Sequence, residues 1–119
     1  MKKLTRKEEE VMKILWKMGK AFVKDIVEQY DDPKPHYNTV SSLVRLLQEK
    51  GIVGFTQYGT TYEYFPLISK EEYRKTFMKQ VVSDYFDNSY KSAVAFFVKE
   101  KGLSPAELEE LVKMIKEQE

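Results

Sequence analysis

Hydrogen-bonding side chains recur at helical spacing between residues 37 and 50. The small ones are Asn38, Thr39, Ser41 and Ser42, and Arg45 follows them. Amide, hydroxyl and guanidinium groups on one helix face can bind the base edges and phosphates of a nucleic acid. The same residue types also form an ordinary solvated face, and Ser, Thr or Asn at a helix start can act as a cap. Composition alone leaves both interpretations open.

Other site chemistries find little support. The chain has no cysteine and one histidine, His36, so disulfides, thiolate ligands, cysteine nucleophiles and a zinc site are excluded. The carboxylates of residues 8–10 and 31–32 lie at an expected helix start and at a turn. Favourable interaction with the helix dipole and exposure to solvent account for them without metal binding or acid–base catalysis. No Gly-rich phosphate loop or nucleophile motif occurs. We therefore predict no enzymatic activity, no metal and no cofactor.

The bulk composition is that of a soluble globular protein. Hydrophobic residues make up 42% and charged residues 33% of the 119 residues, and the formal net charge is +1. Residues 1–66 carry +2 and residues 67–119 carry −1, so any polyanion contact depends on local charge placement in the first half. No apolar run approaches the roughly 18 residues of a membrane span, and the N-terminus lacks a signal-peptide pattern. These features predict a cytoplasmic protein without membrane insertion.

Three helices and a hairpin are expected in the first half. A capping box from Thr5 to Glu8 starts the first helix, which ends before Gly19. A short extended piece at 20–23 precedes a second helix at 25–30, and two prolines at 33 and 35 stop it. The third helix covers 37–50 and ends before a glycine. Its expected buried stripe consists of Val40, Leu43, Val44 and Leu47, widened by Leu46.

Two β-type runs follow at 52–58 and 61–65, joined by a two-residue turn at Gly59 and Thr60. Helix, strand, two helices and a hairpin in this order are the winged-helix arrangement, in which the helix before the hairpin enters the DNA major groove. The hairpin would lie over the DNA backbone or minor groove. The predicted DNA-binding residues are Tyr37, Asn38, Thr39, Ser41, Ser42, Arg45, Lys50, Gln57, Tyr58, Thr60 and Thr61. Tyr37, Lys50 and Tyr58 are the expected phosphate partners.

The second half is expected to hold three helices, which begin at the cap residues Ser69, Ser89 and Ser104. We predict a winged-helix DNA-binding domain at 1–68 and a helical dimerisation domain at 69–119, mainly α overall with a small antiparallel β wing. About fifty residues cannot bury so many large apolar side chains alone, so a second copy is expected to cover them, although folding back on the first domain is the alternative. The predicted dimer residues are Phe77, Val81, Tyr85, Phe86, Val94, Phe97, Leu108, Leu111, Val112 and Ile115.

Several segments together resemble the penicillinase repressor family of winged-helix transcriptional repressors. They are residues 4–16 with Glu9, Val11, Met12, Ile14 and Trp16, residues 37–51, residues 91–97 and residues 103–111. The resemblance covers nearly the whole chain. It implies a homodimeric repressor bound to an inverted-repeat operator in double-stranded DNA. Asn38 and Ser41 stand where antibiotic-responsive relatives carry basic residues, which implies a different operator.

The resemblance also implies how repression could end. Antibiotic-responsive relatives work with a membrane sensor protease that cleaves an Asn-Phe pair in the dimerisation helices. That pair aligns best with Phe96 and Phe97, whose first residue departs from the pattern. Copper-responsive relatives use C-terminal cysteines, which this chain lacks. Two alternatives stay open: an effector-sensing regulator with a pocket among the C-terminal helices, and a winged-helix protein–protein module that does not bind DNA.

Overall fold

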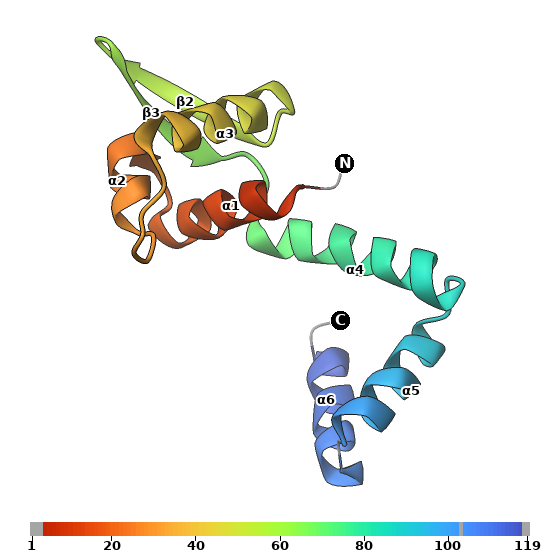
Figure 1. Cartoon of the computed structure of the whole chain (residues 1–119). Coiled ribbons are helices and arrows are strands. Elements are labelled where there is room, and N and C mark those ends of the chain that lie inside the picture. The colour runs from red at the N-terminus through yellow and green to blue at the C-terminus, as the bar shows by residue number, and fades with distance from the viewer. Residues whose placement is uncertain (1–3, 103, 118–119) are drawn as a thin grey trace. The chain divides into compact units, whose positions relative to one another are not determined.

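The computed structural model describes residues 4–102 and 104–117 (Figure 1). In chain order, its elements are α1 (Arg6–Met18), β1 (Ala21–Phe22), α2 (Val23–Glu28), α3 (Tyr37–Glu49), β2 (Val53–Tyr58), β3 (Thr61–Pro66), α4 (Lys70–Phe86), α5 (Tyr90–Lys101) and α6 (Pro105–Glu117). This order confirms the predicted fold class, which is mainly α with a small antiparallel β wing.

The N-terminus of α1 has the predicted capping box. The Thr5 hydroxyl accepts from the Glu8 amide at 3.2 Å, and the Glu8 carboxylate accepts from the Thr5 amide at 2.9 Å. The helix ends at Gly19, whose φ of 84° suits a residue without Cβ. Its buried apolar face consists of Val11, Met12 and Leu15. α1 therefore presents one apolar stripe to the core.

β3 is the central strand of an antiparallel sheet with the order β1-β3-β2. Tyr58 pairs with Thr61, which leaves Gly59 and Thr60 as the predicted two-residue turn. Gly59 has a φ of 63°, the left-handed conformation that such turns require. Ala21 pairs with Tyr64, so the short extended piece before α2 is β1, which adds a further strand to the hairpin formed by β2 and β3. The hairpin is thus anchored to the helices at its base.

The hydrophobic core of the first unit joins α1, α2 and α3 to the base of the sheet. Its members come from every one of these elements: Leu4, Val11, Met12, Leu15, Ala21, Val23, Ile26, Val40, Val44, Leu47, Ile52, Val53, Tyr64 and Tyr73. α3 is held along its length by three of them, each with no exposed surface: Val40, Val44 and Leu47. Burial of such side chains stabilises by about 1.5–3 kcal/mol each, so the orientation of α3 about its axis is well determined.

Two expectations about the first unit are wrong. Leu46 does not widen the buried stripe of α3, because its side chain is 47% exposed. Each helical residue is rotated by about 100° from the previous one, which carries Leu46 away from the face formed by Val44 and Leu47. The second helix begins at Val23 rather than Asp25, directly after β1, with Phe22 as its N-cap residue.

The chain divides into two compact units, residues 1–76 and 77–119. This division falls inside α4 instead of before it, because Tyr73 on the first turn of α4 belongs to the core of the first unit. Its hydroxyl donates to Glu9 at 2.8 Å, and its ring lies 5.5 Å from that of Trp16. The Trp16 indole N–H donates in turn to the Ile68 carbonyl at 3.0 Å. The assignment of 1–68 and 69–119 as functional domains stays a prediction.

The second unit contains most of α4 together with α5 and α6. Val82 and Ala93 are buried in it, and the rings of Phe86 and Phe96 lie 5.5 Å apart across the turn between α4 and α5. Ser89 accepts from the Ser92 amide, and Ser104 accepts from the Glu107 amide, as predicted for the caps of α5 and α6. Tyr85, one of the predicted dimer residues, is 76% exposed within this chain.

Candidate nucleic-acid interface

α3 is a well-defined helix of 13 residues that ends where the sequence predicts. The His36 imidazole Nδ1 accepts from the Asn38 amide at 3.3 Å and caps its N-terminus. Lys50 is its C-cap residue, and Gly51 follows with a φ of 77°. Because the core residues occupy one side, the remaining faces of α3 are available for contact with a partner.

The polar side chains predicted to bind DNA lie on two neighbouring faces of α3. Asn38, Thr39 and Ser42 are exposed on the outside of the helix. Tyr37, Ser41 and Arg45 follow one another at intervals of four residues and border a cleft beside the helix. The outer face therefore offers amide and hydroxyl groups, and the cleft face adds a phenol and a guanidinium.

The hairpin contributes an aromatic surface to this cleft. Phe55 pairs with Tyr64, and their rings and that of Tyr62 lie within 6.4 Å of one another on one face of the sheet. The rings of Phe55 and Tyr62 meet edge to face at 5.0 Å, a favoured arrangement of aromatic quadrupoles. Tyr64 is buried, whereas Phe55 and Tyr62 are about 40% exposed.

The tip of the hairpin is polar, exposed and ordered by its own hydrogen bonds. The Gln57 amide donates to the Gly59 carbonyl at 3.0 Å, and the Thr61 hydroxyl donates to the Tyr58 carbonyl at 2.8 Å. Tyr58 is 53% exposed, and its ring packs 5.9 Å from Phe22. Side chains held in this way lose less conformational entropy when a partner binds.

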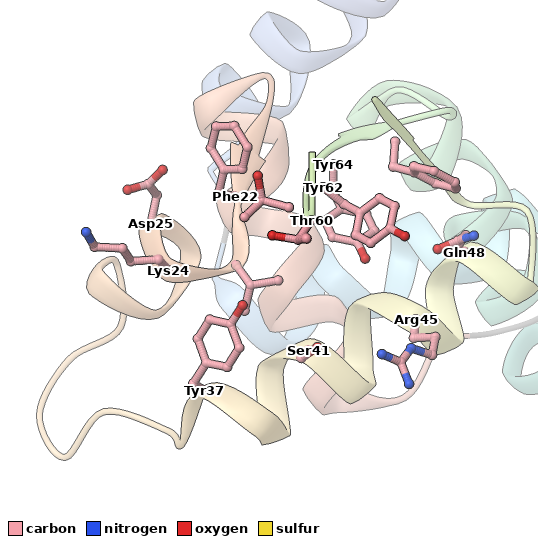
Figure 2. A pocket seen from close by; sticks show the side chains of 13 residues that line it. Phe22, Lys24, Asp25, Tyr37, Ser41, Arg45, Gln48, Thr60, Tyr62 and Tyr64 are labelled. Carbon is pink, nitrogen blue, oxygen red and sulfur yellow. The ribbon is translucent and has the colours of Figure 1, made fainter. Parts of the chain in front are cut away.

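A cleft of about 910 Å³ lies between α3, the start of α2 and the hairpin. Figure 2 shows Lys24 and Asp25 on the α2 side, Tyr37, Ser41 and Arg45 along α3, and Tyr62 and Tyr64 on the hairpin. Five of the predicted DNA-binding residues therefore border one cavity: Tyr37, Ser41, Arg45, Thr60 and Thr61. Gln57 and Tyr58 lie at the hairpin tip outside it. Lys24 is a lining residue that sequence analysis missed.

The guanidinium of Arg45 interacts electrostatically with the phenol of Tyr64, which also borders the cleft. Burial raises the pKa of the Tyr64 phenol above its ordinary value, and the nearby Arg45 guanidinium partly offsets this effect. Tyr64 is thus a neutral hydrogen-bonding group at neutral pH. The cleft combines this neutral aromatic floor with cationic side chains at its rim.

Lys50 lies apart from the cleft and has a partner within the protein. Its ammonium lies 2.8 Å from both carboxylate oxygens of Glu8, which is only 1% exposed. Lys20, just before β1, lies 4.0 Å from Glu63 on β3. Each of these lysines is therefore offset by a carboxylate. Contact of any predicted residue with DNA stays a prediction.

Within residues 4–102 and 104–117, no group of three or more His, Asp or Glu side chains is placed to hold a metal ion. In the same part of the chain, no helix is both long and apolar enough to cross a membrane.

The first unit has three helices and a β-hairpin wing, and the third helix carries an exposed polar face next to the hairpin. This arrangement defines a winged-helix protein of the kind that regulates transcription. The chain belongs to the penicillinase repressor family, whose model matches residues 4–117. This match confirms the family expected from the sequence.

Named relatives support the same assignment. The methicillin resistance regulatory protein MecI of Staphylococcus aureus (strain N315) is 27% identical over 105 residues, which cover 87% of this chain and 85% of that protein. The MecI protein of Mammaliicoccus sciuri is 27% identical over 107 residues, with the same coverage. The penicillinase repressor of Bacillus licheniformis is 24% identical over 115 residues, 92% of this chain and 87% of that protein. Family membership therefore supports a transcriptional repressor rather than an enzyme.

Proposed function

We propose that the protein is a cytoplasmic homodimeric repressor that binds an inverted-repeat operator in double-stranded DNA. In this proposal α3 enters the major groove, where Asn38, Thr39 and Ser42 face the bases. The hairpin lies against the backbone or minor groove. The observation that carries the proposal is the exposed polar face of α3, which lies beside the hairpin. Ser41 and Arg45 of this helix border the same cleft as Thr60 of the hairpin.

Dimerisation is supported by the exposed apolar side chains of the second unit. Those at least 37% exposed are Phe77, Met78, Tyr85, Tyr90, Val94, Phe96 and Phe97. Soluble monomers rarely expose so many large apolar groups together, and a second copy would cover them by a two-fold symmetric contact. Of the other predicted dimer residues, Val81, Phe86 and Leu108 are half-buried. The side chains of Leu111, Val112 and Ile115 lie outside the described residues.

Release by a membrane sensor protease that cuts between Phe96 and Phe97 is a further part of the proposal. Both residues lie inside α5 and their rings are 5.8 Å apart, while Phe96 also contacts Phe86. A protease must unwind this helix to bind it in extended form, so cleavage requires local opening of the second unit. N-terminal sequencing of fragments from induced cells tests this step: a fragment that begins at Phe97 supports it, and fragments with other ends contradict it.

The operator is best found without assuming its sequence. The purified protein is incubated with a library of random DNA duplexes, and the bound duplexes are sequenced over successive rounds. A homodimer is expected to enrich an inverted repeat whose half-sites lie about 10 base pairs apart, one turn of DNA or a multiple of it. Light scattering at micromolar concentration is expected to give twice the chain mass of 14.1 kDa. No enrichment at low salt, or a monomer, would contradict the proposal.

A protein–protein module is the second candidate, because one observation favours it. Residues 20–66, which hold α2, α3 and the hairpin, carry five cationic and six acidic side chains and so have a formal charge of −1. Strong DNA binders usually carry a basic excess on the binding domain. The same enrichment experiment separates the candidates, since a module of this kind selects no DNA sequence.

A further inference from the structure

Residues 20–66 contain five cations, namely Lys20, Lys24, Lys34, Arg45 and Lys50. They are the cations of the elements that a winged helix brings to DNA. Their partners in the structure divide them into two groups, and this division bears on how the proposed repressor holds DNA.

Three of the five cations have partners within the protein. Glu8 offsets Lys50 at 2.8 Å, and Glu63 lies 4.0 Å from Lys20. The Lys34 ammonium donates to the carbonyls of Glu28 and Tyr30, at 3.0 and 2.7 Å, where α2 ends. The first two lysines add no net charge to the surface. Lys34 is held at the C-terminal end of α2, where carbonyl groups favour a cation.

Lys24 and Arg45 form the second group. No ion pair or hydrogen bond of either side chain occurs among the residues that the structure describes. Both are exposed, and both border the same cleft, Lys24 from the start of α2 and Arg45 from the middle of α3 (Figure 2). The cleft is therefore flanked by the two of these five cations that have no partner among the described residues, and the carboxylate of Asp25 also borders it.

The hairpin, in contrast, has no cation. Between Val53 and Pro66 the only charged residue is Glu63, and the exposed polar side-chain groups are hydroxyls, phenols and one amide. A hairpin of this kind can donate hydrogen bonds from neutral groups to phosphates and sugars, but it has no Lys or Arg to neutralise a phosphate, and this neutralisation is what makes DNA affinity depend on salt. Its contribution to DNA binding would therefore be insensitive to salt.

We propose that Lys24 and Arg45 are a phosphate clamp: one DNA backbone segment passes through the cleft between α3 and the hairpin, and each protomer makes two ionic contacts with it. This inference rests on the proposed repressor function and refines its site. It adds Lys24 to the DNA-binding residues, assigns Arg45 to a phosphate rather than a base, and leaves base recognition to neutral groups such as Asn38 and Ser42.

The clamp predicts an unusually weak dependence of affinity on salt. Two contacts in each protomer give four in a dimer, so log Kd should rise with log salt concentration with a slope of about 3.6. Arg45→Gln and Lys24→Gln should each reduce that slope to about 1.8, because each removes two contacts from the dimer. Both variants should weaken binding to the selected operator and to a scrambled duplex by the same factor, since phosphates carry no sequence information.

Fluorescence anisotropy with the selected operator, across a salt series, measures these slopes. Lys13→Gln is the matched control: it removes an exposed lysine of α1 that borders a different groove, and its slope should equal that of the unchanged protein. Thermal unfolding of each variant checks that these surface substitutions leave the fold intact.

Each other outcome overturns the clamp. A slope of about 6 or more for the unchanged protein would show that further cations contact the phosphates. A loss confined to the operator for Arg45→Gln would assign Arg45 to a base, and an unchanged slope for Lys24→Gln would remove Lys24 from the interface. Failure of the proposed function itself looks different, because the unchanged protein would then show no preference for any selected sequence.

Discussion

The ammonium of Lys50, at the C-terminal end of α3, lies 2.8 Å from both carboxylate oxygens of Glu8, in the first turn of α1. Glu8 also accepts from the Thr5 amide as part of the capping box of α1. One buried carboxylate thus ties the start of the first helix to the end of the third. This contact positions α3 on the core and directs the charge of Lys50 inward.

Removal of the Lys50 charge should destabilise the fold. Lys50→Met leaves the Glu8 carboxylate buried without its cation, which should cost about 2–3 kcal/mol of unfolding free energy. Urea unfolding, followed by the fluorescence of the single tryptophan at position 16, measures this loss at fixed protein concentration. The double variant Glu8→Gln/Lys50→Met should recover part of it, because no unpaired charge then stays buried. A cost below about 0.5 kcal/mol, typical of surface changes, would show that the pair contributes little.

The same pair predicts an acid-sensitive stability. Burial alone would raise the pKa of the Glu8 carboxyl, but the Lys50 ammonium and the Thr5 donors outweigh burial and hold that pKa below its ordinary value of 4.5. A carboxyl with a lowered pKa in the folded state stabilises the protein above its unfolded pKa and loses this effect as the pH falls through the folded pKa.

The stability that Glu8→Gln loses relative to the unchanged protein should therefore become smaller at acidic pH. The difference in urea midpoint between the unchanged protein and this variant should be full near neutral pH and should shrink as the pH falls below 4.5. Glu49→Gln is a suitable control, since Glu49 is exposed at the end of α3. A difference that stays constant down to about pH 2 would contradict the linkage.

Features that depend on neighbouring residues could be predicted from the sequence. The capping boxes at Thr5 and Ser69, the caps at Ser89 and Ser104, and the turn at Gly59 all occur in the structure. In each case the partners are at most three positions apart, so residue type and spacing determine the contact. Element order followed from these start and stop signals, and the fold class followed from the order.

Contacts between distant residues could not be predicted in this way. Glu8 and Lys50 are 42 positions apart, and sequence analysis treated Glu8 as a capping-box residue and Lys50 as a phosphate partner. Lys24 was missed because its place in the cleft depends on how α2 packs beside α3 and the hairpin. Leu46 was misplaced because apolar character alone does not distinguish the edge of a buried stripe from an exposed position.

The first turn of α4 should be loosened by the loss of one hydroxyl. Tyr73→Phe keeps the ring contact with Trp16 but removes the hydrogen bond to Glu9, at a cost of about 1 kcal/mol. Burial and the Glu9 carboxylate raise the pKa of Tyr73 above 10, so this stabilisation should persist below pH 10 and decline as the pH rises above it. Urea unfolding of both proteins measures the cost. Tyr90→Phe, at an exposed position of α5, should cost nothing, and equal effects of both changes would contradict this account.

Substitutions at two positions of α4, one turn apart, should affect folding and dimerisation separately. Val82 is 2% exposed and Tyr85 is 76% exposed. Val82→Ala should lower the stability of the fold by about 2 kcal/mol through lost burial and the cavity that it leaves. Tyr85→Ala should instead raise the dimer dissociation constant by about tenfold or more, as expected for an aromatic residue in an interface. Light scattering over a dilution series measures the second effect, and an unchanged dimer would remove Tyr85 from the proposed interface.

The cap of α3 offers a test in which stability and DNA binding change in opposite directions. His36→Asp replaces a 3.3 Å imidazole acceptor with a carboxylate, a preferred N-cap that also interacts favourably with the helix dipole, so the fold should gain about 0.5–1 kcal/mol. The added negative charge at the start of the proposed recognition helix should weaken operator binding by about fivefold at low salt, and less at higher salt as screening increases. Ser89→Asp is the matched control, because it adds the same charge at the N-cap of α5 in the second unit. If His36→Asp binds the operator as tightly as the control does, the N-terminus of α3 does not approach the DNA phosphates.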